Sequence, residues 1–270
     1  MTGELLNRAA GEPIAAAVAA DQLERALERL TARHYDANRH RFDYGAAAVA
    51  DEYDDLRRAV GALAAVDPAE LPEPDAARAF WVNVYNALAV HIILETPIAT
   101  SVREREDFFT GPHYCIHGHE VTLDAIEHGI LRGNARKYMA LKAPFGEQDP
   151  RRAWTFAEVD PRIHFVLYTG AVSSPPLRAV PGQGTDAALE QAAREHLAAR
   201  VEVDSERGAA TLPRLFRWYT GDFGGSIDDT LAFVRTRLDD ARAETLARED
   251  IDAAFAAFDW RLNDRYAVLE

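Results

Sequence analysis

Two stretches near the start of the chain repeat apolar residues at helical spacing. Residues 14–33 and 46–65 place alanine, leucine and valine on one face and charged side chains on the other, as amphipathic helices do. Prolines within residues 68–74 then indicate a turn into the next element. We therefore predict that residues 1–75 form a helical portion packed on the remainder of the chain.

The next predicted helix, residues 76–95, is apolar nearly all round and should be buried. Asn83 and Asn86 interrupt it three residues apart, so they share one face. Because a buried amide without a partner costs about 1–3 kcal/mol, something must satisfy both side chains. Structural hydrogen bonds to a loop are the favoured interpretation, and contact with a ligand is the alternative.

The later pattern alternates short strand-like and helical segments. The uninterrupted apolar run IHFVLY at residues 163–168 is typical of a buried central strand. The other predicted elements are a hairpin at 113–122, a helix at 123–132 between Thr122 and Gly133, a helix at 186–200, a hairpin at 201–212 and two final helices. The predicted fold class is α+β, with residues 76–270 as the core of one structural domain and several helices packed on a small sheet.

Glu127 is a charged residue on the apolar side of a predicted helix. At 100° per residue it lies close to Leu123, whereas His128 and Arg132 are expected to point elsewhere. A carboxylate facing the core needs a cation or several hydrogen-bond donors, and Arg162, His164 or Arg132 could provide them. The candidate catalytic residues are Glu127, His164 and Arg162, although a structural ion pair would look the same in sequence.

A loop of small residues follows the predicted central strand. Such loops often line ligand sites, and this one is expected to form the rim of the polar cluster. A serine nucleophile beside His164 has little support, because no G-x-S-x-G motif is present. The candidate ligand-binding residues are Asn83, Asn86, Arg132, Thr169, Ser173 and Ser174.

Four potential metal ligands alternate in the predicted hairpin: His113, Cys115, His117 and His119. On one face of a strand they would resemble a zinc site. Gly118 is expected to turn the chain between the last two and to break that face. A solvent-facing hairpin is favoured, so we predict no metal and no cofactor.

Composition narrows the class of partner. The chain has 270 residues, one cysteine and a formal net charge of −14, which argues against nucleic acid or an anionic membrane as the main partner. The start of the chain lacks the pattern of a signal peptide, and one cysteine fits a reducing compartment. A cytoplasmic location and an unknown small molecule or protein partner are the expectations.

Five segments, taken in order, resemble the family known as domain of unknown function 547. They are FWVNVYNALAVHIILE, VTLDAIEHGILRGN, DPRIHFVLYTGAVSSPPLRAV, TLPRLFRWYTGDFG and FDWRLND, within about residues 76–265. The positions that match its pattern are Asn83, Asn86, Glu127, Arg132, Arg162 and His164. The family has no settled activity, and its members with leucine-zipper segments suggest interaction roles.

The chain departs from the family pattern at two positions. Many members carry cysteine at the position of Thr169, and bacterial members often carry another at that of Ser174. If relatives use a thiolate nucleophile, this chain cannot do so there.

Two functions of different classes remain open from the sequence. The favoured hypothesis is a binding or scaffolding module built around a buried polar cluster. The alternative is a hydrolase or acyl transferase in which Glu127 and His164 perform acid–base chemistry. A deep pocket opening onto Glu127, His164 and the following loop would favour the enzyme.

Overall fold

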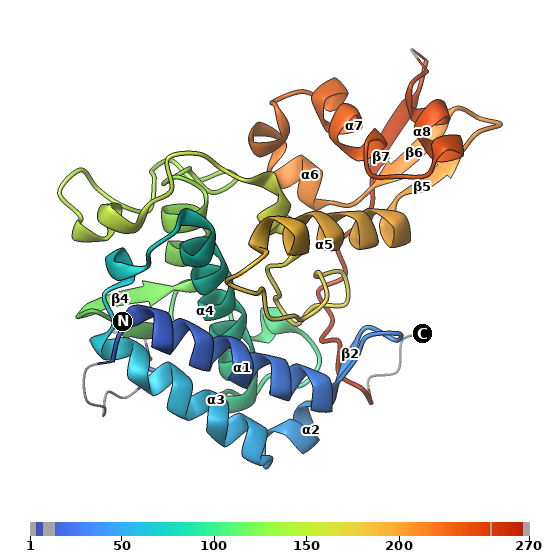
Figure 1. Ribbon diagram of the computed structural model, residues 1–270. Helices are drawn as coiled ribbons and strands as arrows, with labels where there is room; N and C mark the ends of the chain where they lie inside the picture. The colour runs from blue at the N-terminus through green and yellow to red at the C-terminus, as the bar shows by residue number, and fades with distance from the viewer. Residues whose placement is uncertain (1–3, 8–13, 249, 267–270) are drawn as a thin grey trace.

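The computed structural model describes three stretches of the chain, residues 4–7, 14–248 and 250–266. Helix α4 (Pro74–Glu95) runs through the middle of the molecule, and other helices cover it (Figure 1). Helix α1 (Ala16–His34) packs against α4 and against α3 (Asp51–Ala62) on one side, and α5 (Thr185–Arg200) crosses α4 on the other. The α+β fold class is confirmed.

Helix α4 is buried over almost its whole length, as its sequence predicts. Pro74 occupies its first turn, where the missing N–H is not needed, and Pro97 follows its end. Helix α4 is also long and apolar enough to cross a membrane, but 83% of its most apolar window is buried inside the protein. Its hydrophobicity is therefore explained by its position in the core.

The strands form three small antiparallel or mixed sheets. Their order is β1-β2, β3-β4 and β5-β6-β7, with β7 parallel to β6. The predicted hairpin at 113–122 is confirmed, with His117 and Gly118, both at positive φ, as its two-residue turn. The strands are β1 (Tyr35–Asp36), β2 (Arg41–Phe42), β3 (His113–Ile116), β4 (His119–Thr122), β5 (Glu202–Asp204), β6 (Ala209–Leu212) and β7 (Asp252–Phe255).

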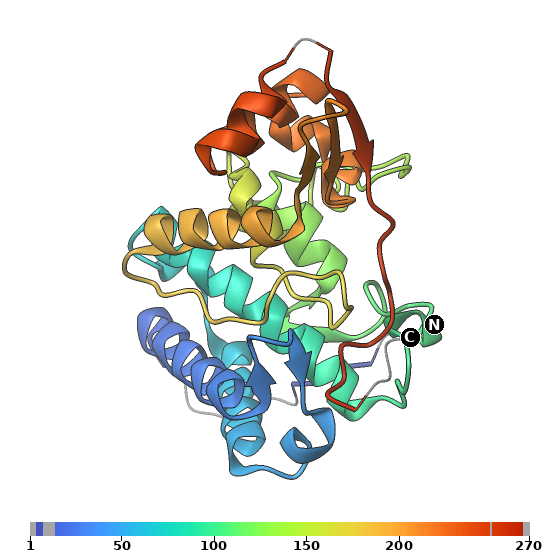
Figure 2. The ribbon, with the colours of Figure 1, turned by 90° about the vertical axis from the view of Figure 1, so that its right-hand side faces the viewer.

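Short helices connect these elements. After α5, the chain forms a separate layer at the top of Figure 2. This layer consists of the β5-β6-β7 sheet and the last α-helices. The remaining α-helices are α2 (Tyr44–Ala47), α6 (Leu215–Trp218), α7 (Ile227–Arg235) and α8 (Asp240–Leu246). The 3-10 helices are η1 (Leu63–Ala65), η2 (Pro68–Glu70), η3 (Val102–Glu104), η5 (Pro150–Trp154), η6 (Pro161–Phe165) and η7 (Thr220–Phe223), and η4 (Ala125–Leu131) is a π-helix.

The prediction of a central strand at residues 163–168 is wrong, although these residues are buried, as predicted. Residues 161–165 form the 3-10 helix η6, which Asp160 caps by accepting a hydrogen bond from the backbone N–H of Arg162 at 3.0 Å. Pro161 supplies the fixed φ of a first helical position. The residues that follow η6 have no strand partner, because side chains of α4 bind their backbone.

Asn83 and Asn86 provide those side-chain partners. The Asn86 amide donates to the carbonyls of Val166 (2.9 Å) and Arg178 (3.0 Å), and its oxygen accepts from the N–H of Tyr168 (2.8 Å). Asn83 makes a reciprocal pair with the backbone of Val180, both bonds at 2.8 Å. Both asparagines therefore hold a loop, which supports the structural interpretation over contact with a ligand.

The segment after β7 returns along the side of the molecule to β2 (Figure 2). Its backbone forms hydrogen bonds with the loop that Asn83 and Asn86 hold. The N–H of Val172 donates to the carbonyl of Arg261, and the N–H of Asn263 donates to the carbonyl of Gly170. Gly170 adopts φ +76°, and a Cβ there would lie 2.4 Å from Ile93, so only glycine fits. The loop is thus held between α4 and the end of the chain.

Replacing Asn86 with alanine should lower the free energy of unfolding by about 3 kcal/mol, because three buried backbone groups lose their partner. Urea denaturation measures the change. Asn38, an exposed residue, is the matched control, and its alanine variant should remain within about 0.5 kcal/mol of the wild type. Equal stability of the two variants would contradict this account of the loop.

Candidate functional site

A cluster of buried polar side chains forms where η4, η6, η7 and α4 meet. Glu127, His128 and Arg132 come from η4 and its end, and His164 comes from η6. Each of these four is at most 5% exposed. The burial of Glu127 confirms its prediction. His128 and Arg132, which were expected to point away from the apolar side, are buried as well, because η4 is buried on every side.

The π-helical geometry of η4 is set by its surroundings. Gly129 lies against the ring of Phe145, so close that a Cβ there would come within 2.4 Å of a ring carbon. The Asn134 side chain fixes Phe145 through hydrogen bonds to its backbone N–H and C=O, both at 2.9 Å. Thr122 and Gly133 bound this helical segment, as predicted.

The prediction that Arg132, Arg162 or His164 forms an ion pair with Glu127 is wrong. None of Arg132, Arg162 and His164 lies within ion-pair distance of its carboxylate. The Tyr219 hydroxyl donates to Oε1 at 2.5 Å and the Tyr85 hydroxyl to Oε2 at 3.3 Å. The only ion-pair contact among the described residues is His128 Nδ1, 3.8 Å from Oε1.

Asp222, which sequence reasoning missed, is the residue that joins the cluster. Its carboxylate accepts two hydrogen bonds from Arg132, at 2.5 and 2.7 Å, and one from His164 Nε2 at 2.7 Å. The His164 ring stacks on Tyr219 with centroids 3.9 Å apart. Asp222 stands in the segment TLPRLFRWYTGDFG, and the need of buried Arg132 and His164 for an anion was the available signal.

Charge and burial set the protonation of the cluster. Burial acts to raise the pKa of Asp222, but the bonds from Arg132 and His164 outweigh it and lower the pKa to about 2. Burial also acts to raise the pKa of Glu127, yet the potentials of His128, His164 and Arg132 and the Tyr219 hydroxyl leave it below its ordinary value. Both carboxylates are therefore ionised at neutral pH.

His128 is a neutral acceptor at neutral pH. Burial lowers the pKa of its imidazole. Arg132 Nη1 donates to His128 Nδ1 at 2.8 Å, which requires that nitrogen to be unprotonated.

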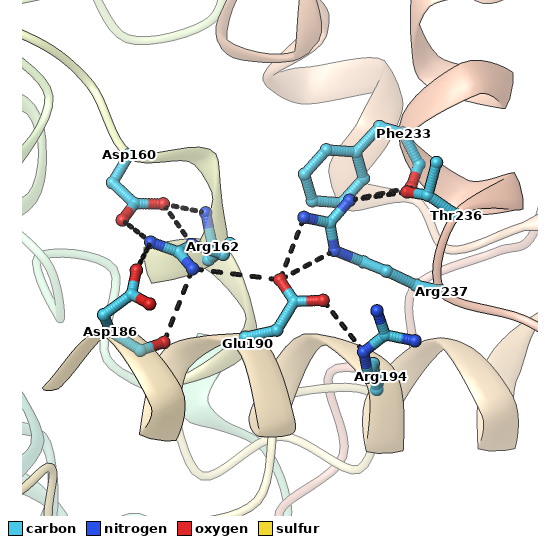
Figure 3. Close-up of polar contacts among 8 residues, drawn as sticks. All are labelled: Asp160, Arg162, Asp186, Glu190, Arg194, Phe233, Thr236 and Arg237. Atoms are coloured by element: carbon cyan, nitrogen blue, oxygen red, sulfur yellow. Dashed lines mark hydrogen bonds and ion pairs between the residues drawn. The ribbon is translucent and has the colours of Figure 1, made fainter. Parts of the chain in front are cut away.

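Arg162 lies outside the cluster, contrary to expectation. It turns toward α5, where it binds Asp160 and Asp186, each at 2.7 Å, while Glu190 lies 3.8 Å away and also pairs with Arg237 and Arg194 (Figure 3). Its position at the start of η6 points it away from His164 and into an ion-pair network that links η6, α5 and the end of α7. Its contacts are therefore structural.

A cavity of about 80 Å³ lies directly above the cluster. Glu127 and His164 line this cavity, and so do Thr169, Ser173, Ser174 and Pro175 from the loop after His164. The other lining residues are apolar or aromatic: Tyr85, Phe109, Leu167, Leu215, Trp218, Tyr219, Phe258 and Trp260. An adjoining cavity of about 190 Å³ shares Glu127, Tyr219 and both tryptophans and adds Asp124, His128, Lys137 and Tyr138.

The three hydroxyl groups of the rim differ in their bonding. Ser174 Oγ donates to the carbonyl of Ala171 at 2.8 Å, and Ser173 Oγ accepts from the N–H of Asp259 at 2.9 Å. Thr169 Oγ1 is buried and has no hydrogen-bond partner among the described residues. Asn83 and Asn86 do not line the cavity.

The hairpin residues considered for zinc are spread apart. His113 is buried, with Nδ1 3.2 Å from the carbonyl of Gly111, whereas His117 is half exposed in the turn. Within the part of the chain that the structure describes, no group of three or more His, Cys, Asp or Glu side chains is arranged to hold a metal ion.

The family resemblance is confirmed by comparison with family models. Residues 69–197 match the model described as "Protein of unknown function, DUF547". The match covers α4, η4, η6 and most of α5 and ends before the segments that supply Tyr219, Asp222 and Trp260. No curated protein and no solved structure matched the chain.

Asp222→Asn should reduce stability at pH 7 and flatten its dependence on pH in acid. The pKa of Asp222 falls from an ordinary 3.8 to about 2 on folding, which corresponds to about 2 kcal/mol of stability. That contribution is present above pH 4 and is lost as the pH falls through 2, because the unfolded chain takes up the proton first.

Urea denaturation between pH 2 and pH 7 measures this effect. The difference in the free energy of unfolding between the wild type and Asp222→Asn should become smaller as the pH falls. A gap that stays constant would show that Asp222 does not titrate as the structure requires. Asp228→Asn, an exposed carboxylate in α7, is the matched control and should show the wild-type profile.

Proposed function

We propose that this chain is a small-molecule-binding domain whose ligand occupies the cavity above Glu127 and His164. The observation that carries the proposal is the composition of the cavity, in which aromatic walls surround a few convergent polar groups. Ligand sites in proteins commonly have this composition. The unpartnered Thr169 Oγ1 supports a polar ligand atom, since buried hydroxyls otherwise find a partner.

The construction of the walls also supports this proposal. Trp218 stands at the end of α6, while Phe258 and Trp260 come from the returning C-terminal segment. The Phe258 and Trp260 rings lie 4.4 Å apart, and Trp218 is 5.1 Å from Phe258. These three rings are only partly buried and line the cavity, so they provide apolar contact area for a ligand.

Leu167→Trp should abolish ligand binding, because the added ring volume fills the cavity that Leu167 lines. A fragment library tested by ligand-observed NMR, with tryptophan fluorescence as a second readout, measures binding. Leu141→Trp, at a residue 91% exposed, is the control for an added indole. Fragment binding that persists unchanged in folded Leu167→Trp would place the ligand elsewhere and overturn the proposal.

An enzyme is the second candidate, favoured by the geometry of His164. Asp222 binds its Nε2, which fixes the proton there, and no described residue hydrogen-bonds Nδ1. An imidazole held in this way by a carboxylate can accept a proton at its other nitrogen. In such a hydrolase or acyl transferase, Nδ1 would take the proton of a water or acceptor hydroxyl as its oxygen attacks the acyl carbon, and would return that proton to the alcohol or amine that leaves. Asp222 would stabilise the intervening imidazolium.

Any ester or amide hydrolysis by the purified protein should then depend on His164. His164→Ala should reduce turnover at least about 100-fold, the usual contribution of a general base, and Asp222→Asn should reduce it as well. His34→Ala, at the end of α1, controls for the loss of an imidazole. Turnover that survives His164→Ala at the wild-type rate would exclude this role.

A further inference from the structure

Among the described residues, no arginine or lysine lies within ion-pair distance of the Glu127 carboxylate. Arg132 donates hydrogen bonds from Nε and Nη2 to the carboxylate of Asp222. The ammonium of Lys137 binds both oxygens of Asp124, at 2.9 and 2.8 Å. Counting arginine and lysine against the carboxylates, the cluster retains one negative charge, and that charge is on Glu127.

The hydrogen bonds to Glu127 do not neutralise it. Tyr219 and Tyr85 are neutral donors, and burial together with the nearby Glu127 charge raises the pKa of both hydroxyls well above the ordinary value. The Glu127 carboxylate is therefore ionised, but its direct hydrogen-bond donors are neutral hydroxyls, which leaves its negative charge available to a positively charged group. Glu127 lines both cavities, so that charge can come from a ligand.

The walls favour the same kind of ligand. The face of an aromatic ring attracts a cation, most strongly for tryptophan, and Phe109, Trp218 and Trp260 line both cavities together with Glu127. The Tyr219 ring is already covered by His164, at 3.9 Å, and by Arg132, at 4.8 Å. Rings of this group already contact cations of the protein: Arg103 lies 4.5 Å from the centroid of Trp260, and Lys137 lies 5.1 Å from that of Phe109. An unpaired carboxylate and aromatic faces therefore converge on one cavity.

We propose that the ligand is a small organic cation, an amine or a methylated ammonium, whose head lies between the aromatic walls and Glu127. This inference rests on the proposed small-molecule site and specifies its ligand class. The cavity of about 80 Å³ equals roughly two to three times the volume share of a water molecule. It therefore accepts a compact head group, with any longer part of the ligand directed toward the adjoining cavity.

The test compares cations with neutral molecules of the same shape. Isothermal titration calorimetry measures binding of choline and of its carbon isostere, in which a tert-butyl group replaces the trimethylammonium. Two further pairs are compared in the same way: tetramethylammonium with an alcohol that carries the neopentane carbon skeleton, and butylamine with butanol. At least one cation should bind ten or more times more tightly than its isostere.

Glu127→Gln should remove this preference and leave binding of the neutral isostere unchanged. Glu147→Gln, which removes an exposed carboxylate, should retain it and so controls for the acidic charge of the whole protein. Circular dichroism confirms that each variant is folded. If Glu127→Gln does not fold, the comparison of cation with isostere on the wild-type protein decides the matter alone.

The outcomes separate this inference from the proposed function. Equal binding of cations and isosteres, or binding of isosteres only, overturns the cationic ligand while the site itself stands. Failure of every cation to bind a protein that binds library fragments in the same cavity has the same meaning. Fragment binding that is insensitive to Leu167→Trp overturns the site, and this inference falls with it.

Discussion

The structure depends on how one buried, irregular segment satisfies its backbone hydrogen bonds. Residues 166–180 cross the interior without belonging to a helix or a sheet, so their N–H and C=O groups need other partners. Two asparagines of α4 bind the two ends of this segment, and the returning C-terminal chain binds the part between them. Helix α4, the loop and the C-terminal segment are therefore held together by one connected set of hydrogen bonds.

The site is a consequence of the same arrangement. His164 directly precedes the segment, and Thr169, Ser173 and Ser174 lie within it, so anchoring the loop also places the polar floor and the rim of the cavity. The C-terminal chain that completes the loop's hydrogen bonds also brings Phe258 and Trp260 to the aromatic wall. Fold and site thus share their supporting contacts, and a change in the anchoring asparagines is expected to reach the cavity.

Within the cluster, geometry decides which charges are paired. Asp222 can accept from both Arg132 and His164 because η7 presents its carboxylate between them. Each of these bonds uses a donor that the sequence also offered as a partner for Glu127. Glu127 is left with tyrosine hydroxyls, which stabilise a carboxylate by hydrogen bonding without cancelling its charge. That distribution distinguishes the candidate site from the partly exposed ion-pair network around Arg162, in which each carboxylate contacts an arginine.

Sequence by itself determined the features that local chemistry controls. The amphipathic and apolar periodicities located α1, α3, α4 and α5, the His117–Gly118 turn located a hairpin, and the cost of burying polar groups singled out Asn83, Asn86 and Glu127. Only the tertiary structure decided the partners. IHFVLY became a 3-10 helix and an irregular segment because Asn86 replaced a neighbouring strand. Glu127 is bound by Tyr219, because Arg132 and His164 donate their hydrogen bonds to Asp222, which lies 58 residues beyond His164. Periodicity reports whether a side chain is buried, whereas the identity of its partner depends on contacts between segments distant in the chain.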